Sequence, residues 1–203
     1  PLYYPRRAIQ ALKDEASNTA NASPIVIYTE GDDPATQGDP AVFEVLLWGY
    51  PHRVVDGRYA ALIPSTSSKA LLSYETLPAL PILQALGARG EQFFARRRSE
   101  PLYVTERMNM PATLNALKAD VRLTLLSTPI EYENGVLLIG WRWEKVGNAQ
   151  NQHWRMSTIW KIKTAPNDRT LHLFHHVRAG VDRQLIAQED VPMSSGSWQV
   201  GDL

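Results

Sequence analysis

The sequence predicts an α/β unit followed by an all-β unit. In the first half, short runs of β-branched residues alternate with stretches of helical periodicity, which is typical of a mainly parallel sheet covered by helices. From Val121 onward, apolar and polar residues alternate between turn dipeptides, which is typical of antiparallel strands. A chain of 203 residues, 44% of them hydrophobic, is long enough to form one large domain or two small ones.

Helices and strands alternate along the first half. The helices are expected at Arg6 to Ser17, Val42 to Trp48 and Pro78 to Leu86, and the strands at Pro24 to Thr29, His52 to Val55, Ala60 to Ile63 and Ala70 to Tyr74. In the first helix, Ile9 and Leu12 lie on one apolar stripe. Phe93 to Arg97 and Leu102 to Glu106 are expected to add an antiparallel pair at one edge of the sheet. This order predicts a Rossmann-like open sheet over residues 1–115.

Alternating runs in the second half predict strands with one buried face. Their apolar positions are Val121, Leu123 and Leu125, then Leu137, Ile139, Trp141 and Trp143, then Trp154, Met156, Thr158, Trp160 and Ile162. Asn134-Gly135 separates two of these runs and is a favourable hairpin turn. We therefore expect a β-sandwich of jelly-roll or immunoglobulin-like type over residues 116–203.

The tryptophans and histidines of this half have competing interpretations. Trp141 and Trp143 are expected to fill the interior of the sandwich, but exposed tryptophans would instead form a platform that stacks on sugar rings. His172 and His176 would share one face of a strand, about 13 Å apart at about 3.3 Å per residue. One zinc ion, with ligands at about 2 Å, cannot readily bind both. We expect structural histidines and no metal, and we keep His176 as a candidate ligand-binding residue.

Charged residues follow the first two predicted strands at their carboxyl ends. These residues are Glu30, Asp32, Asp33, Asp56 and Arg58. Ligands of open parallel sheets gather at this edge, so the cluster could form a metal or sugar-hydroxyl site. The alternative is that Gly-Asp-Asp-Pro is simply a turn, where Asp and Pro are locally favoured. The sequence contains neither glycine-rich nucleotide fingerprint, so no nucleotide cofactor is expected.

Composition narrows the remaining function classes. The absence of cysteine excludes disulfides, thiolate nucleophiles and cysteine-bound zinc, and a formal net charge of zero gives no reason to expect a nucleic-acid partner. No nucleophile elbow or other catalytic template is present, so no catalytic residue is assigned. No apolar run approaches the roughly 18 residues of a membrane helix. The chain starts at Pro1 and stops at Leu203 within an unfinished β pattern, so we expect a segment of a longer protein.

The C-terminal half contains a series of residues that occur in a recognisable order. They are Trp141-Arg142, Phe174, His176, Gly180, Ala187-Gln188, Asp190, Trp198 and Gly201-Asp202. In this order they resemble the extracytoplasmic tail of bacterial membrane glycosyltransferases of the dolichyl-phosphate-mannose protein mannosyltransferase-like family. Pro192 comes one residue early, Val200 occupies a proline position and Asp202 replaces a glutamate. In the first half, Val55-Asp56-Gly57 and Leu62-Ile63-Pro64 are similar to segments that follow the last membrane helix of such proteins.

The resemblance implies a location and a partner rather than a catalytic site. In that family, catalysis lies in loops between membrane helices, and the full protein transfers a sugar from a polyprenyl-phosphate donor. This chain would then be a non-catalytic accessory region on the extracytoplasmic face of the membrane, joined to its own upstream transmembrane domain. It would bind or orient a glycan or protein acceptor. The alternatives are an independent secreted carbohydrate-binding module and a small metal-dependent hydrolase that uses Glu30, Asp32 and Asp33.

Overall fold

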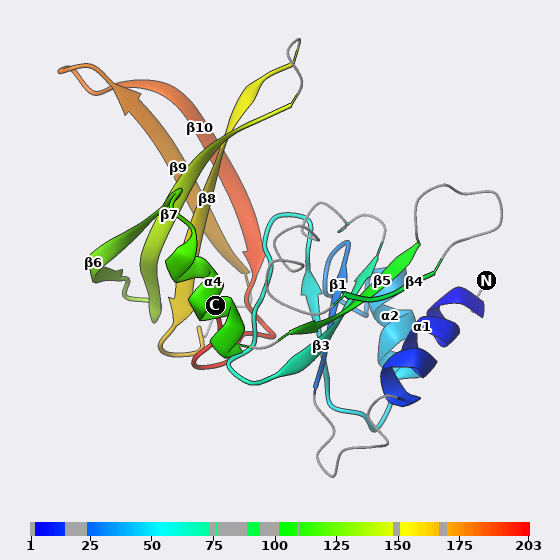
Figure 1. Cartoon of the computed structure of the whole chain (residues 1–203). Coiled ribbons are helices and arrows are strands. Elements are labelled where there is room, and N and C mark those ends of the chain that lie inside the picture. Colours follow the sequence, from blue (N-terminus) through cyan, green and yellow to red (C-terminus); the bar gives the residue numbers. More distant parts are fainter. Residues whose placement is uncertain are drawn as a thin grey trace.

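The computed structural model describes residues 3–14, 24–73, 76, 89–93, 102–108, 110–147, 151–166 and 170–203 (Figure 1). The protein is mostly β, with 47% strand and 17% helix. The helices are α1 (Tyr3–Asp14), α2 (Gly38–Leu46) and α4 (Met110–Ala119). The strands are β1 (Ile25–Thr29), β2 (His52–Asp56), β3 (Ser68–Ser73), β4 (Arg89–Phe93), β5 (Tyr103–Met108), β6 (Leu123–Glu131), β7 (Val136–Val146), β8 (His153–Ile162), β9 (Thr170–Ala179) and β10 (Gln184–Ser194).

The first five strands form one mixed sheet in the order β2-β1-β3-β5-β4. Strand β1 lies parallel to both neighbours, with Ile27 opposite Val54 and Leu71. Strand β5 is antiparallel to β3 and β4, so an antiparallel pair does lie at one edge of the sheet. Its first strand is Arg89–Phe93, which shares only Phe93 with the predicted strand, and residues 94–97 lie outside the described residues. Residues 60–63 form no strand of this sheet. Ile63 instead exchanges two backbone hydrogen bonds with Leu203, of 2.7 and 2.9 Å.

Two helices begin earlier than the sequence pattern predicts. Helix α1 begins at Tyr3 rather than Arg6, and Pro5 lies in its first turn, where a missing N–H breaks no intrahelical bond. Helix α2 begins at Gly38 rather than Val42, and Pro40 likewise lies in its first turn, where a proline is tolerated. The helix expected at Pro78 to Leu86 lies outside the described residues. Among the described residues, no helix is both long and apolar enough to cross a membrane.

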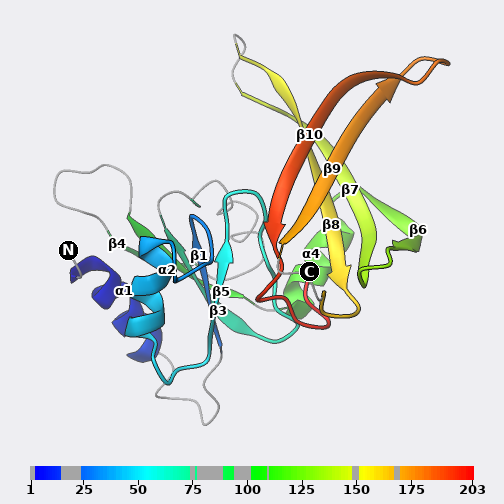
Figure 2. The ribbon, with the colours of Figure 1, turned by 180° about the vertical axis from the view of Figure 1, so that it is seen from behind.

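The two faces of the mixed sheet are covered by different parts of the chain. On one face, Ile25 and Ile27 pack in a cluster with Ile9 and Leu12 of α1 and Phe43 of α2. The opposite face has a second cluster that includes Val26, Tyr28, Val55 and Leu72. Trp198, Leu203 and Ala116 pack against this second cluster. The C-terminal segment therefore covers a face that helices would cover in a doubly wound sheet, and Figure 2 shows it passing beside the sheet.

The later strands form two antiparallel sheets, β6-β7-β8 and β9-β10. Helix α4, which spans the predicted boundary at residues 115/116, precedes them. A bulge between Leu138 and Gly140 changes the expected alternation of β7. Leu138 pairs with Trp160, while Trp141 pairs with Thr158 and Trp143 with Met156. Cross-strand partners share a face, so Leu138 rather than Leu137 and Ile139 lies on the face of these tryptophans.

The tryptophans of these sheets are less enclosed than expected. Trp143 is 40% exposed, so the expectation that it fills a sandwich interior is wrong, and Trp154 is 62% exposed. Trp141 and Trp160 are half-buried. In the described parts of β6 to β10, the buried apolar residues are Val136 and Ile162. These two residues pair with each other at one end of the β7–β8 pair. This end lies next to the C-terminal segment, since the Ile162 N–H donates to the Asp202 carbonyl at 2.9 Å.

Candidate functional site

The charged cluster predicted at the carboxyl ends of β1 and β2 forms around Arg58. Its guanidinium donates to both carboxylate oxygens of Asp56, at 3.0 and 2.5 Å, and to Glu30 at 3.2 Å. Burial would raise the pKa of Asp56, but the side-chain and backbone hydrogen bonds from Arg58 outweigh burial and lower it. The hydrogen bonds to Asp56 in turn raise the pKa of Arg58. The structure therefore brings three of the five predicted residues together as one ion-pair cluster.

Asp33 has the contacts of a turn residue. Its carboxylate accepts hydrogen bonds from the Ala35 N–H and the Thr36 hydroxyl, both at 2.9 Å. These bonds stabilise the loop between β1 and α2 locally, as in an Asx turn. Asp32 is half-buried in the same loop. Within the described ranges, no group of three His, Asp or Glu side chains is placed to hold a metal ion.

A groove of about 430 Å³ opens between the mixed sheet and the two antiparallel sheets. One wall is the segment from Val55 to Ile63, which comprises the end of β2 and the residues after it. The other walls come from the end of α4, from β8 and from the inner face of the β9–β10 pair. Aromatic side chains from three separate segments line it, namely Tyr59, Trp160 and Trp198. A concave site with apolar walls and convergent polar groups is the usual form of a small-molecule site.

Charge in the groove is balanced. Its lining contains three carboxylates and three guanidiniums, which are Asp56, Asp120, Glu189, Arg58, Arg142 and Arg155. Asp120 accepts bidentate hydrogen bonds from Arg122 at 2.9 and 3.0 Å, and a further one from Arg142 at 3.2 Å. These bonds, those of Arg122 foremost, hold the pKa of Asp120 well below its usual range. The groove therefore presents ionised, hydrogen-bonding groups without a net charge.

Glu144 extends this network along β7. Arg155 donates to it at 2.7 Å, and Arg142 lies 3.5 Å from its carboxylate. Burial would raise the pKa of Glu144, but the contacts with Arg155, Arg142 and Arg122 outweigh burial and lower it. Asp120 and Glu144 together hold the guanidiniums of Arg142 and Arg155 in fixed positions. A network of this kind orients the donors that face the groove.

His175 is the groove residue whose hydrogen bonding is incomplete. It lies on β9 directly opposite Glu189 of β10, and both line the groove. Within the described part of the chain, its Nε2 atom is buried and has no hydrogen-bond partner. A buried polar atom without a partner is uncommon in folded proteins and marks a place where a ligand or water can bind.

The other predicted residues lie outside the groove. Trp141 and Trp143 do not line it, and His176 is exposed on the outer face of β9. His172 and His176 share one face of β9, as predicted, because both are exposed. His175 and Leu173 lie on the other face and are half-buried. Sequence reasoning missed Asp120, Arg142, Arg155, His175 and Glu189 as a set. They come from the end of α4 and from strands β7 to β10, and only the packing of these elements brings them together, which no spacing in the sequence indicates.

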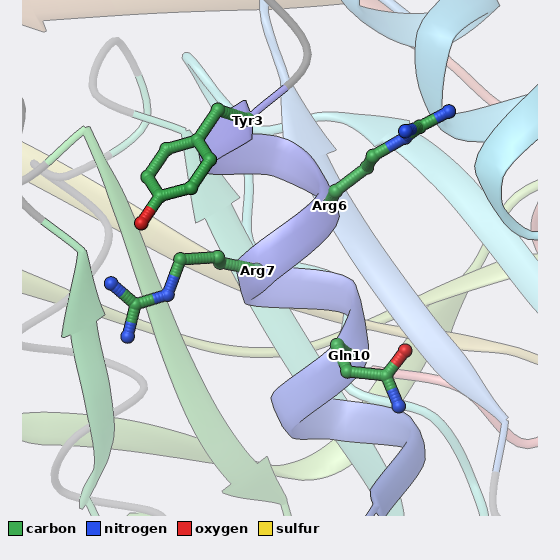
Figure 3. Close-up of a pocket in the computed structure, with 4 residues that line it drawn as sticks. All are labelled: Tyr3, Arg6, Arg7 and Gln10. Carbon is green, nitrogen blue, oxygen red and sulfur yellow. The ribbon is translucent and has the colours of Figure 1, made fainter.

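A second hollow lies on the outer surface of α1, lined by Tyr3, Arg6, Arg7 and Gln10 (Figure 3). All four side chains come from one helix, and the guanidinium carbon of Arg7 lies 5.9 Å from the Tyr3 ring centroid. No second element closes over them in this view. The groove is therefore the better candidate site, because several elements converge on it.

Comparisons with family models, curated proteins and solved structures find no match to this chain. A proposal for the function therefore rests on the chemistry of the groove and on the residues of the family resemblance.

Proposed function

We propose that this chain is a non-catalytic accessory region of a polyprenyl-phosphate-sugar-dependent membrane glycosyltransferase, on the extracytoplasmic face of the membrane, and that its groove binds the carbohydrate of the acceptor. In this proposal, the mixed sheet is a reduced Rossmann-like unit. The two antiparallel sheets are an open sandwich of jelly-roll or immunoglobulin-like type. The upstream transmembrane domain of the same protein carries out the chemistry.

The single observation that carries this proposal is the composition of the groove. Its carboxylates and guanidiniums balance, so a neutral ligand suits it better than an anion or a cation. Paired groups such as Asp56–Arg58 and Asp120–Arg142 offer adjacent donors and acceptors, which match the neighbouring hydroxyls of a sugar. Trp160, Trp198 and Tyr59 offer amphipathic rings beside them. A neutral, polyhydroxylated ligand meets all of these features.

The residues of the family resemblance also help to form the groove. Trp198 lines it and packs on the mixed sheet, while Asp202 forms an ion pair with Arg53 of β2. Gly201, at φ +92°, allows the turn between them. The C-terminal residues that carry the resemblance therefore connect the mixed sheet to the antiparallel sheets on the other side of the groove.

One specific observation favours the secreted carbohydrate-binding module as a rival. Trp143 and Trp154 are both exposed, and their pairing with Met156 and Lys145 places them on one face of the β7–β8 pair. Such a face can act as a sugar platform without using the groove. The metal-dependent hydrolase has no comparable support, since Glu30 pairs with Arg58 and Asp33 is occupied by its turn.

Binding of neutral oligosaccharides, measured by saturation-transfer NMR, separates the groove from the platform. Glu189→Trp, at an exposed position that lines the groove, is expected to block binding, while Trp143→Ala is expected to leave it unchanged. The reverse result would support the platform. No binding of any neutral glycan by the folded wild-type chain would overturn the groove proposal. The genomic sequence upstream of Pro1 tests the tether, which requires membrane-spanning helices there.

A further inference from the structure

Two β-hairpins extend from the body of the molecule and end on the same side. In Figures 1 and 2, the β7–β8 and β9–β10 hairpins rise above the other elements of the molecule. The first hairpin has Lys145 opposite Trp154, and the second turns at Gly180 to Arg183. The two hairpins diverge and both reach the top of the view in Figure 1, so a surface that lies across them can meet both ends.

Large apolar side chains are exposed at these ends. Val181, in the turn of β9 and β10, is 98% exposed, and Ile186 on β10 is 60% exposed. Trp154, on the first hairpin, is 62% exposed. Turn residues are usually polar or Gly, so a Val in the turn has no conformational advantage there. Single exposed apolar residues are ordinary, but an apolar residue at the end of each projecting hairpin indicates a surface that is covered in use.

Basic side chains surround these apolar residues. Arg178 and Arg183 flank the turn, and Arg178 donates to the Arg183 carbonyl at 3.2 Å. On the other hairpin, the ammonium of Lys145 lies 5.2 Å from the Trp154 ring centroid. Glu144 is compensated by Arg155, and the turn itself contains one carboxylate, Asp182. The hairpin ends therefore carry a net positive charge on a chain whose formal net charge is zero.

We propose that these hairpin ends, defined by Lys145, Trp154, Arg178, Val181, Arg183 and Ile186, dock the protein onto the surface of an anionic lipid bilayer. Apolar tips with adjacent cations fit that surface because the apolar groups enter the acyl boundary while the cations meet lipid phosphates. Trp suits the interface by its amphipathic ring. A protein partner would need a continuous complementary face, whereas the two ends are separate projections. This surface is distinct from the groove and stands independently of the proposed function.

Co-sedimentation of the whole chain with vesicles tests this proposal. We expect binding to vesicles of phosphatidylcholine with about 30 mol% phosphatidylglycerol and much weaker binding to phosphatidylcholine alone, with a decrease as salt rises. Val181→Asp combined with Ile186→Asp is expected to reduce the partition coefficient by at least about tenfold. Arg178→Ala combined with Arg183→Ala should weaken binding to anionic vesicles by a similar factor.

Val45→Asp is the matched control, since Val45 is 74% exposed but lies on α2, away from the hairpin ends. It should bind vesicles like the wild type. Thermal melting of each variant establishes that the chain is folded, and the exposed arginine pair provides a second test if the aspartates impair folding. Equal binding by wild type and the aspartate pair, or no binding to anionic vesicles, would overturn the proposal. So would a lipid-free dimer that the aspartate pair abolishes, because a second copy would then cover this surface.

Discussion

Arg53 and Asp202 form an ion pair that joins the second strand of the mixed sheet to the penultimate residue of the described chain. The Arg53 Nη2 atom lies 2.5 Å from Asp202 Oδ2, and the Asp202 side chain is fully buried. The same carboxylate accepts backbone hydrogen bonds from Ser65 at 3.1 Å and Gln199 at 2.8 Å. Residues that are 149 positions apart thus share one buried polar network. This network holds the C-terminal segment over the open face of the mixed sheet.

Asp202→Ala is expected to destabilise the protein by about 3 to 5 kcal/mol, because it removes the counter-charge of the Arg53 guanidinium and leaves two backbone donors without their acceptor. Urea unfolding measures this loss. Asp182→Ala, at an exposed position in the β9–β10 turn, is the control and should change stability by less than about 0.5 kcal/mol. Similar losses in both variants would show that the buried network contributes little.

Gly201→Ala should also destabilise the C-terminal segment, by more than about 1 kcal/mol. Gly201 has φ +92°, and a Cβ there would lie 3.0 Å from the Ser65 Cβ. Gly180→Ala separates the two causes, since Gly180 has φ +73° with no heavy atom within 4 Å of the added Cβ. We expect a smaller loss at Gly180, measured by the shift in urea midpoint. An equal loss would assign the whole effect to backbone conformation.

Acidification should destabilise the protein through the carboxylates of the groove. The hydrogen bonds from Arg122 and Arg142 depress the folded-state pKa of Asp120, so the unfolded state binds more protons in the acidic range. The stabilisation is present above the unfolded value of about 3.9 and is lost as pH falls toward the depressed folded value. Asp56 and Glu144 act in the same direction.

Thermal melting as a function of pH measures this dependence. Asp120→Asn should lower the melting temperature at neutral pH and flatten its decrease on the acid side. Asp190→Asn, at an exposed residue of β10, is the comparison variant. A wild-type profile that stays flat below the ordinary carboxyl range, or that Asp120→Asn leaves unaltered, would contradict the assignment.

The sequence predicts best those strands that are marked by a short run of β-branched or aromatic residues. The β-branched run at β1 and the strand at β5 needed only short-range signals, and both formed where expected within two residues. Strand β4 ends at Phe93, where the predicted strand begins. The start of α1 differed because Pro5 is compatible with a first turn, which makes it a poor marker of where a helix begins.

What could not be predicted depends on register and on packing between distant segments. The bulge at Leu138 and Gly140 reverses which leucine lies with the tryptophans, and no local signal in β7 marks it. The groove could be predicted only in part. The position of Asp56 and Arg58 after a predicted strand indicates a site there, but His175 and Glu189 join the same groove only through packing between distant segments. Likewise, the sequence pattern places Trp198 in the all-β unit, but its side chain packs on the mixed sheet.

Trp198→Ala is the prediction that tests this last relationship. Trp198 is half-buried against the cluster of Tyr28 and Leu72, so its truncation should cost about 2 to 3 kcal/mol, less than for a fully buried Trp. Trp48→Ala is the matched control, since Trp48 is 88% exposed on the turn after α2 and should lose less than about 0.5 kcal/mol. Urea unfolding compares the two variants. Because Trp198 also lines the groove, its truncation should weaken glycan binding while Trp48→Ala does not. Equal stability losses in the two variants would mean that the C-terminal segment does not cover the sheet in solution, and the groove would then lack the wall that this tryptophan provides.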